Sequence, residues 1–258
     1  MKIATWNVNS VMARLPLVLQ WADLRRPDVI CLQETKCIDD KFPRAQFEEL
    51  GYRVEAFGQR TYNGVAILSR LPIENVTRNF PDSPAENQQS RLIAATVAGV
   101  RVVNVYVPNG AFVGSDKYQF KLEWMKSLRK FFDVGYKPDE QVLLCGDFNV
   151  APEDRDVYDP DFWRGRILFS EPEKSALAEM AAWGLVDSFR IFNQEKGRYS
   201  WWDYRAGAFR RDAGLRIDHI WITNALAKAC TGVVIDKEPR GWERPSDHTP
   251  VIAEFDLF

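Results

Sequence analysis

Histidine and cysteine are scarce in this sequence. Its 258 residues include two histidines and four cysteines, at Cys31, Cys37, Cys145 and Cys230. No two cysteines form a CxxC pair, and Cys31 and Cys145 lie within apolar runs. Zinc sites draw on closely spaced Cys and His ligands, and disulfide scaffolds need several cysteines in a short chain. The sequence therefore argues against both, and favours buried thiols in a reducing compartment.

Long apolar runs and linkers are also missing. No apolar run approaches the ~20 residues that cross a bilayer as a helix. Residues 1–10, MKIATWNVNS, lack the basic-then-apolar pattern of a secretion signal and have the pattern of a strand. No Ser-rich, Gly-rich or low-complexity tract divides the chain. We therefore expect residues 1–258 to form a single domain in the cytoplasm, without membrane contact.

The overall charge is nearly balanced. The formal net charge is −2 and the isoelectric point is about 5.9. A protein that binds nucleic acid through much of its surface is normally basic. The composition therefore excludes a uniformly basic nucleic-acid binder, although it leaves room for a local basic patch.

Short β-type runs recur throughout the chain. They are KIATWNV, DVICLQE, YRVEAFG, GVAILS, RLIAATV, VRVVNVYV, QVLLCGDFNV, IDHIWIT, GVVIDK and PVIAEFDL. The runs RLIAATV and RVVNVYV, joined by AGV, predict a hairpin. Helical spacing of apolar residues predicts helices over 14–26, 117–132 and 173–184. About ten strands exceed one ordinary sheet, so we expect an α/β protein with two packed sheets and helices outside.

Polar side chains recur where these apolar runs end. They are Asn7, Asn9, Gln33, Glu34, Tyr106, Asn109, Asp147, Asn149, Asp218, Asp247 and His248. Taken singly, such a residue is more often a turn former or a helix cap. Active sites, however, are commonly built on loops that a rigid sheet supports. The joint occurrence therefore predicts a catalytic site at the strand ends.

Four of these polar residues are acids set against apolar runs: Glu34, Asp147, Asp218 and Asp247. A buried carboxylate costs several kcal/mol unless it is paired or holds a metal. Converging carboxylates with amides beside them suit a hard cation, so we predict a Mg²⁺ site, with Mn²⁺ as a substitute. Asp147 and Asn149 stand two positions apart on one predicted strand, so we expect both side chains on the same face.

Eight motifs in a fixed order resemble one known family. They are NxN from Asn7, LQETK, YVPNG, GDFNVAP, GLVDSFR, WWDYR, GLRID and PSDHTPV, and they extend to His248. The set is similar to the exonuclease III family of abasic-site (AP) endonucleases, in the endonuclease/exonuclease/phosphatase superfamily. This resemblance implies a four-layer α/β sandwich with two central, mostly antiparallel β-sheets flanked by helices.

The resemblance also implies a function. Members of the family are metal-dependent phosphodiesterases of DNA repair, with AP endonuclease, 3′→5′ exonuclease and 3′-phosphatase activities. Water attacks a DNA phosphate in each reaction. The expected partner is double-stranded DNA with abasic sites or blocked 3′ ends, and the expected state is a monomer.

The resemblance implies catalytic and metal-binding roles for the residues that match the family motifs. Glu34 is the main metal ligand, Asp247 lies close to the metal, and Asn7 and Asp147 border it. Asp147 is the base that activates water, and Asn7 orients it. The groups implied around the scissile phosphate are Asn149, His248, Tyr106 and Asn109, with Asp218 holding His248. Because a carboxylate stabilises an imidazolium, we expect Asp218 to raise the pKa of His248.

Residues 196–216 form a local exception to the balanced charge. They hold six basic residues, two acids and five aromatics, a local net charge of +4. Basic groups suit phosphates and aromatic rings suit bases, whereas the alternative is an aromatic core loop with a basic rim. By resemblance, Trp201, Leu215 and Ile217 line a pocket for a flipped-out abasic sugar. The full set of expected DNA contacts is Arg91, Asn109, Leu168, Trp201, Trp202, Arg205, Leu215, Arg216 and Ile217.

Two positions depart from the family pattern. Leu168 stands near the expected sugar pocket where a small residue is common, which suggests a preference for 3′-end trimming or 3′-phosphate removal over abasic incision. Asn9 stands where some members carry an acid, which suggests weaker binding of a second metal. In VDSFR, Asp187 and Arg190 suggest a structural pair.

Two other functions remain open from the sequence. A phosphatase of inositol phosphates or lipids would share the NxN, GDFN and SDH elements, but it gives no reason for WWDYR or YVPNG. A catalytically inactive binding module conflicts with the complete set of acids, amides and His248.

Overall fold

A computed structural model describes residues 1–81 and 89–257, and within these ranges the chain forms two six-stranded sheets. The strands of the first sheet, in order, are β11 (Cys230–Ile235), β12 (Val251–Phe255), β1 (Lys2–Asn7), β2 (Val29–Gln33), β4 (Val65–Ser69) and β3 (Arg53–Phe57). Those of the second are β5 (Glu74–Arg78), β6 (Leu92–Val97), β7 (Val100–Tyr106), β8 (Val142–Asp147), β10 (Asp218–Thr223) and β9 (Leu185–Asp187). The pairs β1–β2 and β7–β8 are parallel, and the other described pairs are antiparallel. The prediction of mostly antiparallel sheets is confirmed.

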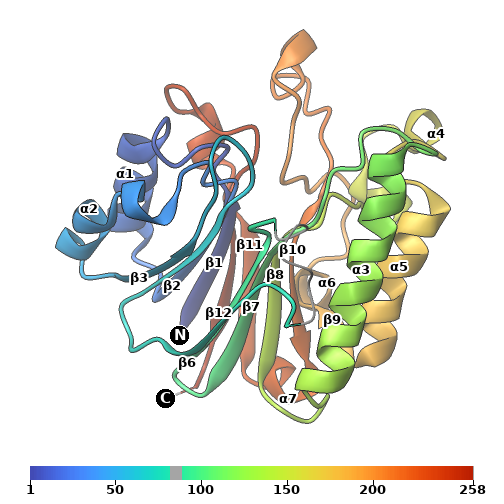
Figure 1. Cartoon of the computed structure of the whole chain (residues 1–258). Helices are drawn as coiled ribbons and strands as arrows, with labels where there is room; N and C mark the ends of the chain where they lie inside the picture. The colour runs from blue at the N-terminus through green and yellow to red at the C-terminus, as the bar shows by residue number, and fades with distance from the viewer. Residues whose placement is uncertain (82–88, 258) are drawn as a thin grey trace.

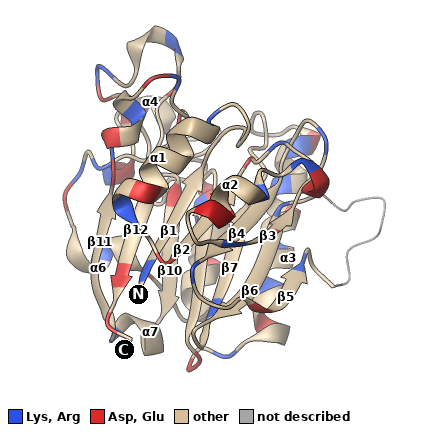
Figure 2. Cartoon of the chain, turned by 90° about the vertical axis from the view of Figure 1, so that its left-hand side faces the viewer, with Lys and Arg blue, Asp and Glu red and all other residues tan. Residues whose placement is uncertain are grey.

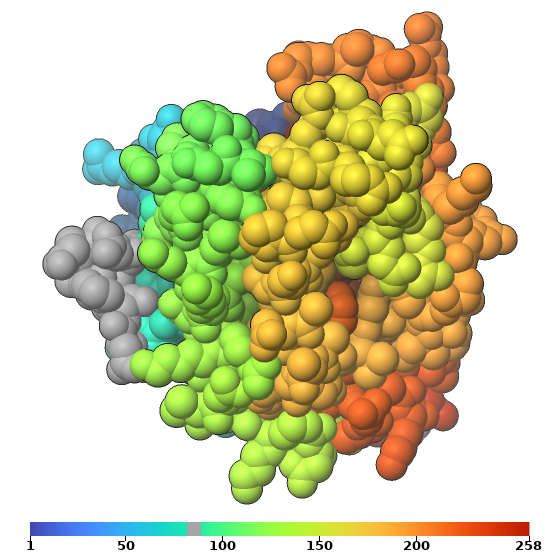
Figure 3. All heavy atoms as spheres, turned by 90° about the vertical axis from the view of Figure 1, so that its right-hand side faces the viewer, coloured from blue at the N-terminus to red at the C-terminus, as the bar shows by residue number. Residues whose placement is uncertain are grey.

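Helices cover the outer face of each sheet (Figure 1). α1 (Leu15–Arg25) and α2 (Arg44–Glu49) lie over the first sheet, and Figure 2 views them from that side. α3 (Asp116–Gly135) and α5 (Glu171–Trp183) lie side by side over the second sheet (Figure 3). All three predicted helices are present. The layers are helix, sheet, sheet and helix, as the four-layer sandwich requires.

Apolar side chains fill the space between the two sheets. β2 and β8 are buried along their whole length, which explains why their sequences are continuous apolar runs rather than alternating ones. Cys31 of β2 and Cys145 of β8 belong to this core. Cys31, Cys37 and Cys145 are buried, as predicted, whereas Cys230 is partly exposed.

Local sequence signals explain several element boundaries. β6 and β7 form the predicted hairpin, and Ala98 and Gly99 between them have φ values of 50° and 80°, as a two-residue type I′ turn requires. Ser170 and Glu173 form a capping box at the start of α5. β5 and β9 escaped prediction because β5 is polar and largely exposed, and β9 has only 3 residues.

Short helical segments connect the larger elements. They are α4 (Pro160–Trp163), α6 (Ser188–Phe192), α7 (Asn224–Ala227), η1 (Asp39–Lys41), η3 (Asp154–Asp156), η4 (Arg205–Gly207) and η5 (Glu238–Gly241). The loop that contains η4 projects beyond the end of the sheets (orange in Figure 1). Among the described helices, none combines the length and the apolar character that crossing a membrane demands.

Strand register brings distant polar residues to one end of the sandwich. Asn7 of β1 lies opposite Gln33 of β2 in a parallel pair, so Glu34 follows directly. In the second sheet Asp147 lies between Tyr106 of β7 and Asp218 of β10. The ends of both sheets therefore meet at one place, which the functional side chains occupy.

Candidate active site

Three potential metal ligands converge at the strand ends. One ligand atom each from Glu34, Asp147 and His248 lies within 4.8 Å of the other two. Glu34 follows β2, Asp147 ends β8, and His248 lies in the loop before β12. The residues are far apart in sequence, and the packing of one sheet on the other brings them together.

Asn7 holds the two carboxylates at close range. Its Nδ2 donates to Glu34 Oε1 and to Asp147 Oδ2, each at 2.8 Å. Its Oδ1 accepts the backbone N–H of Asn9 at 3.0 Å, which fixes the orientation of the amide. The predicted contact between Asn7 and Asp147 is confirmed.

The site carries negative charge that its own residues neutralise only in part. Burial raises the pKa of Asp147 to about 7; the charge of His248 opposes this shift, and Asp218 and Glu34 add to it. Lys36 Nζ lies 2.8 Å from Glu34 Oε2. Closely spaced carboxylate oxygens with a shortage of counter-charge fit a hard divalent cation, which makes Glu34 and Asp147 the candidate ligands.

His248 is held as a cation between two acids. Its Nδ1 lies 2.9 Å from Asp218 Oδ2, and its Nε2 lies 3.7 Å from Asp147 Oδ2. Burial lowers the pKa of His248, but the charges of Asp218 and Asp147 outweigh burial and raise it to about 10. Ser200 Oγ donates to the same Asp218 oxygen at 2.7 Å. The predicted pairing and the direction of the shift are confirmed.

Asn149 reaches the site by a different route from the one predicted. β8 ends at Asp147, and Asn149 follows in a left-handed conformation with φ of 51°. The prediction that Asn149 belongs to the strand is therefore wrong, although its side chain does lie beside that of Asp147, with Asn149 Nδ2 3.3 Å from Asp147 Oδ2. Instead the turn lets the Asn149 backbone N–H donate to Asp147 Oδ1 at 2.8 Å, and its Nδ2 to Val107 O at 3.0 Å. Asn109 Nδ2 donates to Asn149 Oδ1 at 3.1 Å, so the two asparagines meet.

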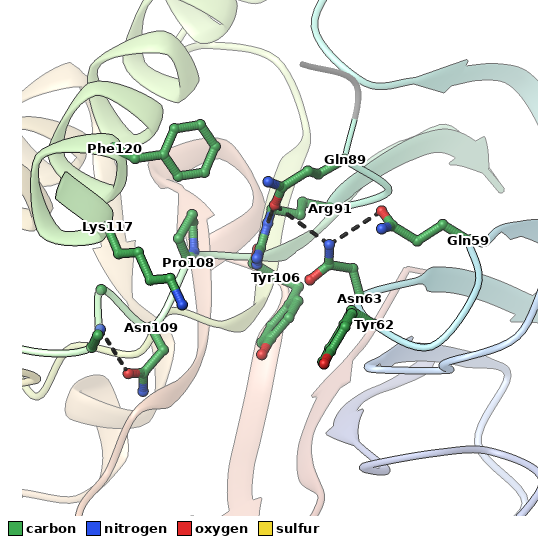
Figure 4. A pocket seen from close by; sticks show the side chains of 12 residues that line it. Gln59, Tyr62, Asn63, Gln89, Arg91, Tyr106, Pro108, Asn109, Lys117 and Phe120 are labelled. Carbon is green, nitrogen blue, oxygen red and sulfur yellow. Dashed lines mark hydrogen bonds between the residues drawn. The ribbon is translucent and has the colours of Figure 1, made fainter. Parts of the chain in front are cut away.

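A cavity of about 550 Å³ opens beside Tyr106 and Asn109 (Figure 4). Arg91 lies over the Tyr106 ring, 4.7 Å from its centroid, and donates to Tyr106 O at 3.1 Å. Burial raises the pKa of Tyr106 well above its usual range, and Glu34 and Asp147 raise it further. The remaining lining residues are Gln59, Tyr62, Asn63, Gln89, Pro108, Gly110, Ala111, Lys117 and Phe120. Tyr106 is therefore a neutral hydroxyl at the edge of an open, partly basic cavity.

Asp247 lies beside the cluster rather than within it. Its oxygens accept from Asn9 Nδ2 and Trp201 Nε1, both at 3.0 Å. Trp201 also faces His248, with ring centroids 6.5 Å apart. These contacts give Asp247 a role in fixing Trp201 and Asn9, while its part as a metal ligand stays a prediction.

The segment 196–216 is partly an aromatic core loop and partly a basic rim. Trp202 is fully buried, and its Nε1 donates to Asp212 at 3.0 Å. Arg216 is 1% exposed and pairs with Asp156 at 2.6 Å and Asp187 at 2.7 Å. Because both side chains are buried, the structure gives no support to the predicted DNA contacts of Trp202 and Arg216. The Arg205 side chain, by contrast, is 88% exposed.

Two further expectations change in this region. Asp187 and Arg190 do not pair with each other: Asp187 pairs with Arg216, and Arg190 with Asp156. Leu168, Leu215 and Ile217 belong to one buried cluster with Trp201 packed against it. These side chains are only 1–4% exposed, so little of their surface is open to a ligand.

Sequence reasoning missed three residues at this site. Lys36 bonds Glu34, and Ser200 bonds Asp218. Lys121 on α3 is fully buried and donates to the backbone oxygens of Asn109 and Asn149. A signal for Lys121 was present, since it is a lysine on the apolar face of a predicted helix.

Comparison with known proteins agrees with this geometry. Residues 4–248 match the Endonuclease/Exonuclease/phosphatase family, and the chain belongs to that family. It is 34% identical over 267 residues to exodeoxyribonuclease III from Haemophilus influenzae, across 99% of this chain and 100% of that protein. A solved 3′ phosphatase from Neisseria, bound to a product DNA hairpin, has a TM-score of 0.94 at 44% identity over 99% of both chains. An AP endonuclease from Archaeoglobus fulgidus has a TM-score of 0.95 at 40% identity over 100% of both chains.

Proposed function

We propose that this protein is a DNA repair nuclease that uses a divalent metal ion to hydrolyse DNA phosphodiester bonds at abasic sites and at 3′ ends. One observation carries the proposal: the carboxylates of Glu34 and Asp147 converge, and the cationic His248 has a ring nitrogen within 4.8 Å of both. The relatives named as exodeoxyribonuclease III, AP endonuclease and 3′ phosphatase support the same chemistry.

Asp147 is the base that takes a proton from the attacking water. A carboxyl group with a pKa of about 7 is matched to proton transfer near neutral pH. Asn7 Nδ2 and the Asn149 backbone N–H each bond a different oxygen of Asp147, at 2.8 Å, and so limit its rotation. A fixed base raises the effective concentration of the reacting groups.

His248, Tyr106, Asn109 and Asn149 bind the phosphate. The phosphate is already anionic, and the transition state adds charge to its oxygens, so fixed donors and cations there lower the barrier. His248 supplies positive charge because Asp218 keeps it protonated. Tyr106 supplies a neutral hydroxyl donor, since burial holds its pKa high.

Glu34 and Asp147 would hold the metal ion, and Asn7 orients both carboxylates. We propose Mg²⁺, for which Mn²⁺ substitutes, because the ligands are hard oxygen atoms. When bound, such an ion supplies positive charge to the phosphate oxygens and helps the leaving oxygen depart.

Double-stranded DNA with an abasic site or a blocked 3′ end is the proposed substrate. Arg91 and Lys117 in the cavity of Figure 4 provide positive charge beside Tyr106, and Arg205 on the projecting loop is exposed, although it pairs with Asp203. This basic flank favours DNA over inositol phosphates or lipids. The single domain, the monomeric state and the cytoplasmic location stay predictions from the sequence.

A second candidate within the same chemistry is an enzyme that mainly processes 3′ ends. Leu168 is 4% exposed and packs with Leu215 and Ile217, the residues expected to line a sugar pocket. A filled pocket disfavours an abasic sugar flipped out of the duplex, while a terminal phosphate needs no such space.

A gel assay tests the proposal. Three labelled duplexes carry an internal abasic analogue, a plain recessed 3′ end or a 3′-phosphate, and wild type is compared with Asp147→Asn and an EDTA control. We expect cleavage with Mg²⁺ that both the substitution and EDTA abolish, and the preferred duplex ranks the two candidates. If no duplex is cut with Mg²⁺ or Mn²⁺, DNA is the wrong substrate, and phosphorylated small molecules and lipids are the substrates to assay next.

A further inference from the structure

A buried ion pair joins the two helices that cover the second sheet. Lys121 of α3 contacts Glu173 of α5, and both side chains have 0% exposure. Burial lowers the pKa of Lys121, while the charge of Glu173 opposes the shift. A buried ion pair rarely stabilises a fold more than well-packed apolar residues would. The contacts of this pair therefore suggest a purpose other than stability.

The Lys121 ammonium is directed at the backbone of two site residues. Its Nζ donates to Asn149 O at 2.6 Å and to Asn109 O at 3.2 Å. With the bond to Glu173, these contacts use all three hydrogens of the ammonium group. Asn109 and Asn149 also meet through their side chains, at 3.1 Å. One buried cation thus fixes two main-chain segments whose side chains lie together at the site.

Glu173 fixes a third segment in the same way. Its Oε1 accepts the backbone N–H of Leu168 at 3.1 Å, and its Oε2 accepts the backbone N–H of Ser170 at 3.0 Å. Leu168 O in turn accepts the backbone N–H of Ala151 at 2.8 Å. The loop before α5 is therefore tied to the turn that follows β8.

The backbone held by these contacts is in an unfavourable conformation. Asn149 has φ of 51° and Leu168 has φ of 73°. Such values persist in residues other than glycine only where the surroundings fix them. The backbone N–H of the same Asn149 donates to Asp147 Oδ1 at 2.8 Å, so the turn and the base are in direct contact. Without the pair, we expect this turn to sample other conformations and to release the base.

We propose that Lys121 and Glu173 are positioning residues for the hydrolytic reaction, which hold the backbone of Asn109 and Asn149 so that their side chains face the phosphate and Asp147. The proposal rests on the proposed nuclease function. Neither residue touches the reacting atoms, because both side chains are buried between α3, α5 and the two turns. Their effect passes through the asparagines.

The test compares wild type with the double variant Lys121→Met/Glu173→Gln. Removing both charges avoids an unpaired buried ion, and the amide oxygen of the introduced glutamine keeps an acceptor at the start of α5. We expect kcat to fall about 10–100-fold, as for a misplaced catalytic group, with KM changed less; the protein should still fold, with a lower melting temperature because buried backbone groups lose their partners. The matched control is Arg129→Met, which removes an exposed contact between the same helices, Arg129 to Glu179 O at 2.6 Å. We expect the control to cleave like wild type.

A second measurement separates positioning from folding. In an Asn149→Ala background, the double variant should lower kcat by a smaller factor than it does in wild type, because one of the two side chains it positions is absent. Full additivity with Asn149→Ala, or a kcat within about twofold of wild type for the folded double variant, overturns the proposal. So does an activity loss that only follows the loss of folded protein.

The two proposals fail in different ways. If wild type cuts no duplex, the nuclease function fails, and the side-chain amide NMR signals of Asn109 and Asn149 then test positioning alone. We expect those signals to move in Lys121→Met/Glu173→Gln and to stay in Arg129→Met. Unchanged amide signals in the double variant overturn the positioning role.

Discussion

His248 Nδ1 lies 2.9 Å from Asp218 Oδ2, and the partner oxygen also accepts from Ser200 Oγ at 2.7 Å. Asp218 is 1% exposed, so its charge acts on the imidazole through a medium with little water. The acid therefore determines that His248 is a cation at neutral pH, and Ser200 keeps the acid in place.

The first prediction concerns this pair. Asp218→Asn should lower the pKa of His248 from about 10, because it removes the negative charge that most strongly counteracts the effect of burial. In the variant, His248 loses its proton at a lower pH than in wild type. Cleavage at about pH 8 should therefore fall about 10–100-fold. NMR titration of the imidazole signals and a pH–rate profile measure both effects. An unmoved His248 titration would show that Asp147 alone sustains the cation.

The second prediction concerns His219, the histidine outside the catalytic centre. Burial, aided by the charge of Arg216, lowers its pKa to about 4. Between about pH 4 and the ordinary value of about 6.5, the unfolded chain binds a proton that the folded protein does not. The free energy of unfolding should therefore fall as pH drops through this window, by up to about 1.4 kcal/mol per pH unit from this group.

Urea unfolding at several pH values, in EDTA, measures this dependence. His219→Gln should show a shallower decline below about pH 6.5, because the titrating group is gone. Other groups contribute equally to both proteins, so the difference isolates His219. Parallel declines would refute the assignment of a neutral, buried imidazole.

The third prediction concerns the metal ligands. Glu34→Gln should weaken Mg²⁺ and Mn²⁺ binding at least about tenfold, because it removes one of two converging carboxylates. Asp247→Asn should weaken it less, since the Asp247 oxygens already accept from Asn9 and Trp201. Calorimetric titration measures both affinities. Equal losses would place the ion on the Asp247 side of the site.

The fourth prediction contrasts two arginines of one segment. Arg205→Ala should weaken DNA binding at every sequence and reduce the salt slope by about one, without lowering the melting temperature, because its side chain is exposed. Arg216→Met should instead cost about 3–5 kcal/mol of stability, because Asp187 loses its buried partner and Asp156 keeps only Arg190. Salt-dependent binding curves and thermal melts test the contrast. A stable Arg216→Met protein that binds DNA weakly would contradict the prediction.

The fifth prediction concerns the crowded pocket. Leu168→Gly removes a buried side chain and relieves its positive φ of 73°. Abasic incision should rise relative to 3′-phosphate removal, and a ratio of rates from the same preparation cancels any loss of folded protein. Phe169→Leu loosens the same cluster without opening position 168, and its ratio should stay at the wild-type value. An unchanged ratio for Leu168→Gly would end the crowding hypothesis.

Much of the fold followed from local pattern. The continuous apolar run of β8 predicted a strand buried on both faces, and the spacing of apolar residues predicted α3 and α5. These signals are short-range because they depend on periods of about 2 and 3.6 residues. β5 and β9 were not predicted, because a polar or very short edge strand shows little periodic spacing of apolar residues.

The sequence by itself determined the elements and the chemical types of the site: carboxylates and amides at the ends of apolar strands, in an order that a known family shares. Only the tertiary structure decided which residues meet. Strand register placed Asp147 between Tyr106 and Asp218 and Asn7 beside Glu34, and sheet packing brought Asn7 to Asp147. A left-handed turn delivered Asn149, and burial made Arg216 and Trp202 structural. Such outcomes depend on contacts between residues far apart in the chain, which no local period encodes.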